Sequence, residues 1–241
     1  MNKHLSKAAM SVSLLAMMML SVATPAQASI NKDIQISAGS ESDGDSSVNG
    51  DIRVGSGAVV TGGLSTVNGS ITVDSDATVR DVSTVNGSLE IEAGVTTKDL
   101  ETVNGSITLD GNVDVDGGVE AVNGKIRMKA GSTVADDVSN VNGKINITAT
   151  EIGGDLSTVS GNITLSDGAV VKGDLIVEEP SGWGWKNRKK PKIVIGPNSR
   201  VEGNIVLEQE VDLYISDSAE VGGVQGKMSM SDAMRFDGNS P

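Results

Sequence analysis

Val67-Asn68-Gly69 is one copy of a triplet that recurs at nearly even intervals through the middle of the chain. The other copies begin at Val48, Val85, Val103, Val122 and Val141, and a variant follows as Val159-Ser160-Gly161. Successive copies lie 18 or 19 residues apart. A short fixed period is typical of one small structural unit stacked on itself, and not of a globular domain.

Apolar and polar residues alternate within each repeat. In the repeat that begins at Val67, Ile71 and Val73 alternate with polar neighbours, and Ala77 and Val79 follow after a short polar break. Alternation with a period of two predicts strands, and breaks rich in Gly, Asp and Ser separate two or three short strands per repeat. No helical periodicity is present in this region, so the sequence predicts an all-β protein.

Two architectures fit this pattern. In an antiparallel meander, each Asn-Gly would be a two-residue hairpin turn, which would pair Leu64 with Val73 and Thr66 with Ile71. That arrangement leaves the valine before every Asn-Gly on the polar face. In a parallel β-solenoid (β-helix), each repeat is one coil, and we expect the same valines to point inward.

The solenoid is therefore the favoured fold, as a single body over residues 29–225 with 18–19 residues per coil. The crossover rule for parallel strands predicts a right-handed winding, although a period near 18 also suits left-handed triangular coils. Stacked amides can hydrogen-bond along the axis of such an assembly. The predicted asparagine ladder consists of Asn49, Asn68, Asn86, Asn104, Asn123 and Asn142.

Residues 1–28 have the organisation of a cleaved signal peptide. A short basic start precedes the apolar run from Ala8 to Leu20, and Ala26-Gln27-Ala28 offers the small-x-small cleavage pattern. The run is too short to span a bilayer, which needs about 20 apolar residues. With no cysteine in the chain, the segment is not a lipoprotein signal. We expect export to the periplasm or surface of a bacterium with an outer membrane, with no transmembrane segment in the mature chain.

Composition limits the possible chemistry. The chain has no cysteine, and its only histidine, His4, lies in the predicted signal peptide. The mature chain would therefore lack the Ser-His-Asp and Cys-His nucleophiles and histidine-type zinc sites. Residues 110–117 have oxygen ligands spaced as in a calcium loop, but the Gly and final Glu of such a loop are misplaced. We predict no enzyme activity, no cofactor and no metal, and the net charge of −13 disfavours nucleic acid.

One basic segment interrupts the stack at 180–192. It contains both tryptophans of the chain and five basic residues within an acidic protein. One interpretation is a solvated loop between two coils, and the other is a contact site for an anionic partner such as a lipid headgroup or an acidic glycan. The candidate contact residues are Trp183, Trp185, Lys186, Arg188, Lys189, Lys190 and Lys192.

The polar end of the chain, residues 226–241, also contains large apolar residues. Met228, Met230, Met234 and Phe236 interrupt an otherwise polar segment. We interpret this segment as a cap or tail over the last coil, because an exposed strand edge invites pairing with another chain. The alternative is a contact between copies of the protein.

Two stretches resemble known families. Ile-Val-Ile-Gly-Pro-Asn-Ser-Arg-Val-Glu-Gly-Asn-Ile (193–205) and Ala-Val-Val-Lys-Gly-Asp-Leu (169–175) resemble the coils of bactofilins, which are polymer-forming β-helix proteins. The Thr-Val-Asn-Gly-Ser-Ile-Thr-Val units are similar to exported β-strand-repeat proteins described as adhesins. Bactofilins are normally cytoplasmic, whereas this chain has an export signal, so what this resemblance implies is end-to-end self-association and not a cytoskeletal role.

These observations predict a non-catalytic structural or adhesive β-solenoid of the cell envelope that could assemble with itself. A polysaccharide-acting β-helix enzyme is the alternative, because such enzymes need only Asp, Arg or calcium. A second alternative is an envelope protein that binds anionic lipid or glycan through the basic segment.

Overall fold

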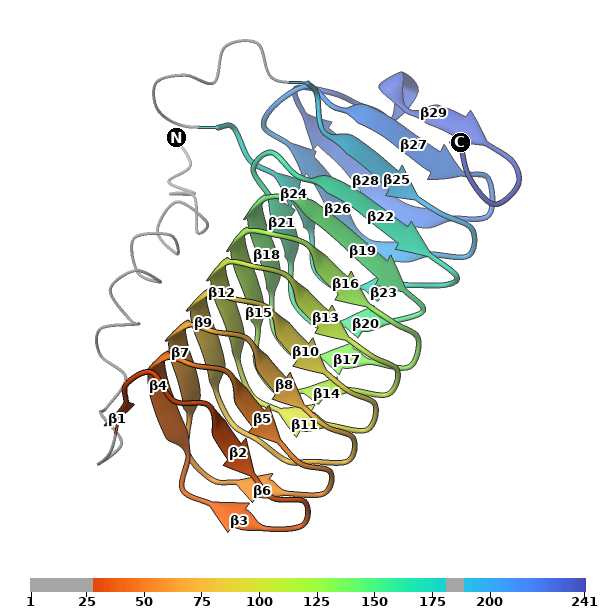
Figure 1. Ribbon diagram of the computed structural model, residues 1–241. Helices are drawn as coiled ribbons and strands as arrows, with labels where there is room; N and C mark the ends of the chain where they lie inside the picture. Colours follow the sequence, from red (N-terminus) through yellow and green to blue (C-terminus); the bar gives the residue numbers. More distant parts are fainter. Residues whose placement is uncertain (1–27, 181–188) are drawn as a thin grey trace.

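The computed structural model describes residues 28–180 and 189–241, and these residues wind into one continuous stack of coils (Figure 1). The signal peptide before Ala28 and the basic-segment residues Trp183, Trp185, Lys186 and Arg188 lie outside the described residues. A complete coil contributes one strand to each of three faces, and corresponding strands of successive coils pair in parallel. The predicted parallel β-solenoid is confirmed.

The first face contains the strands that end in the Asn-Gly corners. Its strands are β1 (Ala28–Ser29), β4 (Asp45–Asn49), β7 (Leu64–Asn68), β9 (Val82–Asn86), β12 (Leu100–Asn104), β15 (Val119–Asn123), β18 (Val138–Asn142), β21 (Leu156–Thr158), β24 (Leu175–Val177), the second half of β26 (Arg200–Leu207), and β28 (Glu220–Gly226).

The second face is an 11-stranded parallel sheet. Its strands are β2 (Ile34–Ile36), β5 (Ile52–Val54), β8 (Ile71–Val73), β10 (Leu89–Ile91), β13 (Ile107–Leu109), β16 (Ile126–Met128), β19 (Lys144–Thr148), β22 (Asn162–Ser166), β25 (Lys192–Ile195), β27 (Asp212–Ser216) and β29 (Met234–Phe236). At a spacing of about 4.8 Å between neighbouring strands, this face is roughly 50 Å long.

The third face is built from short strands. They are β3 (Glu41–Ser42), β6 (Val59–Val60), β11 (Thr96–Thr97), β14 (Asp114–Val115), β17 (Thr133–Val134), β20 (Glu151–Ile152), β23 (Val170–Val171), the first half of β26 and the start of β28, which pairs with it. In the coil between β6 and β11, the isolated bridges of Thr78 to Val59 and to Thr96 continue the face. One 3₁₀ helix, η1 (Met230–Asp232), lies between β28 and β29.

The core is a set of aliphatic columns, because strands that pair in register place equivalent side chains above one another. Leu64, Val82 and Leu100 form one such column on the first face, and each is at most 1% exposed. Ile71, Leu89 and Ile107 form the matching column on the second face and are fully buried. The apolar positions predicted to face inward at Ile71, Val73, Ala77 and Val79 are all buried.

The orientation predicted for the repeat valines is wrong. The inward residues of β7 are its first and third, Leu64 and Thr66, so Val67 faces outward and is 41% exposed. Val48 is 36% exposed, and Val85, Val103, Val122 and Val141 are partly exposed. Only Val159, in the variant copy Val-Ser-Gly, is buried among the described repeat valines. The expected burial of these valines had favoured the solenoid over hairpins, so a correct fold was inferred from an incorrect orientation.

Threonine takes the inward place that had been assigned to valine. The hydroxyl of Thr66 donates to the backbone carbonyl of Gly50 in the preceding coil at 2.9 Å. Thr84 and Thr102 repeat this bond to the carbonyls of Gly69 and Gly87. A buried hydroxyl with a partner avoids the cost of an unsatisfied polar group, so this column is compatible with the core.

The glycine of each Asn-Gly corner is required by close approach between coils. A Cβ atom on Gly105 would collide with the carbonyl oxygen of Gly87, and one on Gly87 would collide with that of Gly69. Both glycines lack a positive φ, so the requirement here is space. Only glycine lets two backbones stack this closely.

The corner between the second and third faces requires left-handed backbone. One residue per coil has a positive φ there, at Gly57, Asp76, Gly94, Asn112, Gly131 and Ala149. Gly, Asn and Asp tolerate this region best. Ala149, with φ of 43°, is the exception and marks a strained corner.

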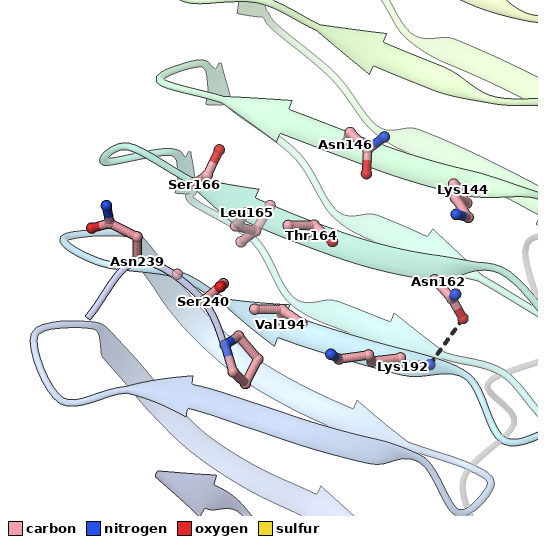
Figure 2. Close-up of a pocket in the computed structure, with 12 residues that line it drawn as sticks. Lys144, Asn146, Asn162, Thr164, Leu165, Ser166, Lys192, Val194, Asn239 and Ser240 are labelled. Atoms are coloured by element: carbon pink, nitrogen blue, oxygen red, sulfur yellow. Dashed lines mark hydrogen bonds between the residues drawn. The ribbon is translucent and has the colours of Figure 1, made fainter. Parts of the chain in front are cut away.

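Both interruptions predicted from the sequence occur near the C-terminal end of the stack. In the sequence, the basic segment lies between β24 and β25, at the position where other coils have the Asn-Gly corner. After β28, the segment 226–241 contributes η1 and then β29, which pairs in parallel with β27 and adds a last strand to the second face. Residues 239–241 then return over the outer surface of that face (Figure 2).

Candidate interaction surface

The asparagine ladder runs along the corner between the first and second faces. The Nδ2 of each asparagine donates to the Oδ1 of the asparagine in the preceding coil, at 2.8 Å for Asn68 to Asn49 and 2.9 Å for both Asn86 to Asn68 and Asn104 to Asn86. Asn123 and Asn142 continue the series at 3.1 Å. Asn31 accepts at one end of the ladder, from Asn49 at 2.6 Å, and Ser160 donates to Asn142 at the other.

This ladder binds coil to coil. Each internal amide uses one N–H and its carbonyl oxygen on its two neighbours, so the column satisfies itself along the axis. Exposed amide hydrogen bonds contribute modestly, about 1 kcal/mol each, but the column repeats that contribution through successive coils. The asparagines therefore stabilise the stack and are not presented as a free binding site.

A second polar column, missed in the sequence, precedes the strands of the first face. The Oδ1 of Asp99 accepts from the N–H of Gly118 at 3.0 Å, and Asp137 and Asp155 accept from the next coil at 2.8 and 2.9 Å. Burial alone would raise the pKa of Asp99, but the N–H of Gly118 and the ammonium of Lys98 outweigh burial and hold the pKa below its usual value. These carboxylates bind coil to coil, as the asparagines do.

Two glutamates on the outer side of the first face have raised pKa values. Burial, then the charges of Glu120, Asp99 and Asp81, raises the pKa of Glu101 to about 7. Burial is also the main cause that raises the pKa of Glu120. Raised pKa values are common at catalytic sites, but here burial together with the stacking of like charges is a sufficient cause.

The described part of the basic segment is partly engaged by the body of the stack. Lys190 forms an ion pair with Glu210 at 2.6 Å, and a side-chain hydrogen bond to that carboxylate raises the pKa of Lys190. The Nζ of Lys192 lies 4.6 Å from the centre of the Tyr214 ring, a cation–π distance. Lys189 has no ion pair among the described residues. The structure thus places Lys190 and Lys192 against neighbouring coils.

Lys192 also lines a groove on the second face, which was not predicted from the sequence. The groove encloses about 320 Å³ and is lined by Lys144, Asn146, Asn162, Thr164, Leu165, Ser166, Lys192, Val194, Gly196, Asn239, Ser240 and Pro241. Figure 2 shows the side chains of β19, β22 and β25 on its floor, with Asn239 and Ser240 crossing one end. Val194 is only 8% exposed, at a position that faces away from the core. Lysines beside amides and hydroxyls can bind an anion that is also a hydrogen-bond partner.

The described residues contain neither a cluster that could hold a metal ion nor a helix that could span a membrane. In 28–180 and 189–241, no three carboxylate, histidine or cysteine side chains gather in a way that could hold a metal ion. Over the same ranges, no helix has the length and apolar character needed to cross a bilayer.

Comparison with known proteins identifies no family for this chain. No protein-family model matches it, and neither the curated proteins nor the solved structures contain a match. The function is therefore inferred from the fold and from the surfaces described above.

Proposed function

We propose that this chain is a non-catalytic structural or adhesive rod of the bacterial cell envelope, exported by the segment 1–28 and able to associate with copies of itself. The observation that supports this proposal most is the use of the repeated polar residues. The asparagine, threonine and aspartate columns all form bonds from one coil to the next. The repeated polar residues thus stabilise the stacking of one coil on the next.

Self-association is supported by the two ends of the stack. Among the described residues, β2 and β29 are the terminal strands of the second face, and each is paired along one edge. The other edge offers backbone N–H and C=O groups to a further strand. Because all strands of this face run parallel, the end formed by β29 is complementary in direction to the end formed by β2 of another copy.

The proposal is tested on the protein as it is made in a bacterial cell. A C-terminally tagged full-length chain should be recovered from the envelope or periplasmic fraction with the mass expected for cleavage after Ala28. Purified mature protein should appear in negative-stain images as rods roughly 50 Å long or as multiples of that length, and sedimentation should report the same species. Recovery of the protein from the cytoplasm with residues 1–28 still attached would contradict the proposal. Cleavage of acidic or neutral polysaccharides by the purified protein would also contradict it.

A further inference from the structure

The distribution of unpaired cations over the rod is uneven. Carboxylates form ion pairs with Arg53, Lys98, Lys129, Lys172, Lys190, Arg200, Lys227 and Arg235. Among the described residues, no carboxylate lies within ion-pair distance of Lys125, Arg127, Lys144 or Lys192. All four belong to the second face and lie in nearby coils, and we call them the cationic patch. Asp212 pairs in register with Lys192 at one end of the patch, but it forms no ion pair with it among the described residues. In an acidic chain, several neighbouring cations without an ion pair indicate an anionic partner.

Three members of the patch share one column. Lys125 and Lys144 immediately precede Ile126 and Ile145, which pair in register, and Lys144 pairs directly with Asn162. The N–H of Lys192 donates to the Oδ1 of Asn162 at 3.0 Å, which places Lys192 next along the same corner. The column therefore presents cation, cation, amide and cation at successive coils, about 4.8 Å apart.

The groove adds hydrogen-bonding groups and excludes competing carboxylate side chains. Its lining includes the amides of Asn146 and Asn162 and the hydroxyls of Thr164 and Ser166, and no aspartate or glutamate. Figure 2 shows Lys144 and Lys192 on two strands with Asn162 on the strand between them. The charge of the same face reverses further along the stack, where Glu90, Glu92 and Asp110 line a separate hollow. The groove is thus a local feature of the second face.

The chemistry of the column identifies the partner class. One coil spacing is close to the length of one pyranose unit in an extended glycan, so a strand lying along the rod axis can offer an acidic group to each lysine. Its hydroxyls can hydrogen-bond to the amides and hydroxyls beside the lysines. The outward side chains of the patch itself, Arg127, Asn146 and Thr164, are polar. Val194 and Tyr214 continue their column in the next two coils, but Val194 is only 8% exposed and the Tyr214 ring lies against Lys192. The patch therefore lacks the exposed apolar anchor that peripheral binding to a bilayer requires in addition to charge.

We propose that the cationic patch and its groove bind an acidic polysaccharide, with sugar carboxylates paired to Lys125, Lys144 and Lys192 and sugar hydroxyls bound by Asn162 and Thr164. This inference deepens the proposed function, because it gives the envelope rod a partner. None of these side chains belongs to the segment 180–188.

The test measures binding of a size-defined oligogalacturonate to the mature protein by calorimetry at low salt. The variant Lys125→Gln/Lys144→Gln should bind roughly tenfold more weakly or worse. The matched control Lys32→Gln/Arg80→Gln removes two cations that also have no ion pair among the described residues, and it should bind as the unchanged protein does. Substituting exposed lysines leaves the core intact, and equal thermal midpoints for the two variants check this.

Four results would overturn the proposal: equal losses in the two variants, unchanged binding in Lys125→Gln/Lys144→Gln, loss of binding in Lys186→Gln/Arg188→Gln alone, or binding of neutral dextran as tight as that of oligogalacturonate. Binding of phosphatidylglycerol vesicles or inorganic phosphate without oligogalacturonate would also overturn it. Rods seen in negative stain are independent of all these results, so failure of the site is distinguishable from failure of the proposed rod.

Discussion

Glu101 of β12 lies directly opposite Glu120 of β15, in register on neighbouring parallel strands of the first face. Both side chains are partly buried on the outer surface of that face. Like charges directly opposite one another destabilise a sheet, and here the aspartates of the adjacent column add to the repulsion. This glutamate pair is a local weakness in a stack that is otherwise well matched from coil to coil.

The pair predicts a dependence of stability on pH. The pKa of Glu101 is raised to about 7 in the fold, above its value in the unfolded chain, so the folded state holds the proton more tightly. Its contribution is therefore most favourable below the unfolded pKa and is lost as pH rises toward 7. Glu101→Gln should remove this loss and raise the free energy of unfolding above pH 7 by about 1–2 kcal/mol, after allowance for solvent screening.

Denaturant unfolding at several pH values checks this expectation. Glu90→Gln on the second face is the matched control, since it changes net charge equally and is not among the charges that raise the pKa of Glu101. The interpretation fails if Glu101→Gln and Glu90→Gln have the same effect, or if the gain from Glu101→Gln is as large at pH 4 as above pH 7.

Ala149→Gly should stabilise the protein. Ala149 has a φ of 43° at the corner where other coils use Gly, Asn or Asp, and glycine removes the steric cost of that conformation. The gain in free energy of unfolding should be about 0.5–1 kcal/mol. Ala130→Gly, at a nearby residue without a positive φ, should instead lose a similar amount. A loss of stability in both variants would show that the corner at Ala149 is not strained.

Gly105→Ala should be strongly destabilising. The added Cβ would collide with the carbonyl oxygen of Gly87 in the preceding coil, so two stacked backbones must separate. We expect a loss of about 3 kcal/mol or more, or failure to fold. At Gly63, the nearest atom to an added Cβ would be 3.6 Å away, so Gly63→Ala should be nearly neutral. Thermal unfolding that ranks the two variants equally would contradict the close stacking of the Asn-Gly corners.

Asn104→Ala should cost about 1–2 kcal/mol of unfolding free energy, because it removes one hydrogen bond to Asn86 and another from Asn123. Thr108→Ala, on the outer side of the next strand and outside the ladder, is the comparison and should cost less. Chemical denaturation of both variants measures the difference. If the two losses are equal, the ladder contributes no more than an ordinary exposed side chain.

The sequence was sufficient for the fold because the period and the alternation agree. Ile71 and Val73 recur one coil later as Leu89 and Ile91, and in-register pairing of these residues forms the core. The asparagine ladder was also predictable, since a polar side chain repeated at the coil period must lie beside its own copies.

Which side chains of a strand face the core was harder to predict from the sequence. Thr66 and Val67 have similar shapes and both favour strands, so alternation alone does not say which one faces the core. A hydroxyl can enter the core only where a carbonyl accepts from it, and that carbonyl belongs to Gly50 in another coil. The signal was the constancy of Thr66, Thr84 and Thr102 at the third position of the strand.

The candidate site was predicted only in part. The sequence pointed to the basic segment, and of the described residues of that segment Lys192 lines the groove. Lys125 and Lys144 were not singled out, because their proximity to Lys192 depends on coil stacking across the inserted segment. The covering of the second face by residues 239–241 depends on the path of the chain after β29 and leaves no periodic trace.

Disulfide formation tests the stacking of coils most directly, because the chain has no cysteine of its own. Ser65 and Ser83 lie opposite one another in neighbouring coils, whereas Ser65 and Thr72 occupy different faces of one coil. Cysteines placed at 65 and 83 should oxidise within the monomer, since paired strands bring Cα atoms within disulfide range, and cysteines placed at 65 and 72 should remain free. Efficient bonding between 65 and 72, with none between 65 and 83, would indicate hairpins and contradict the solenoid.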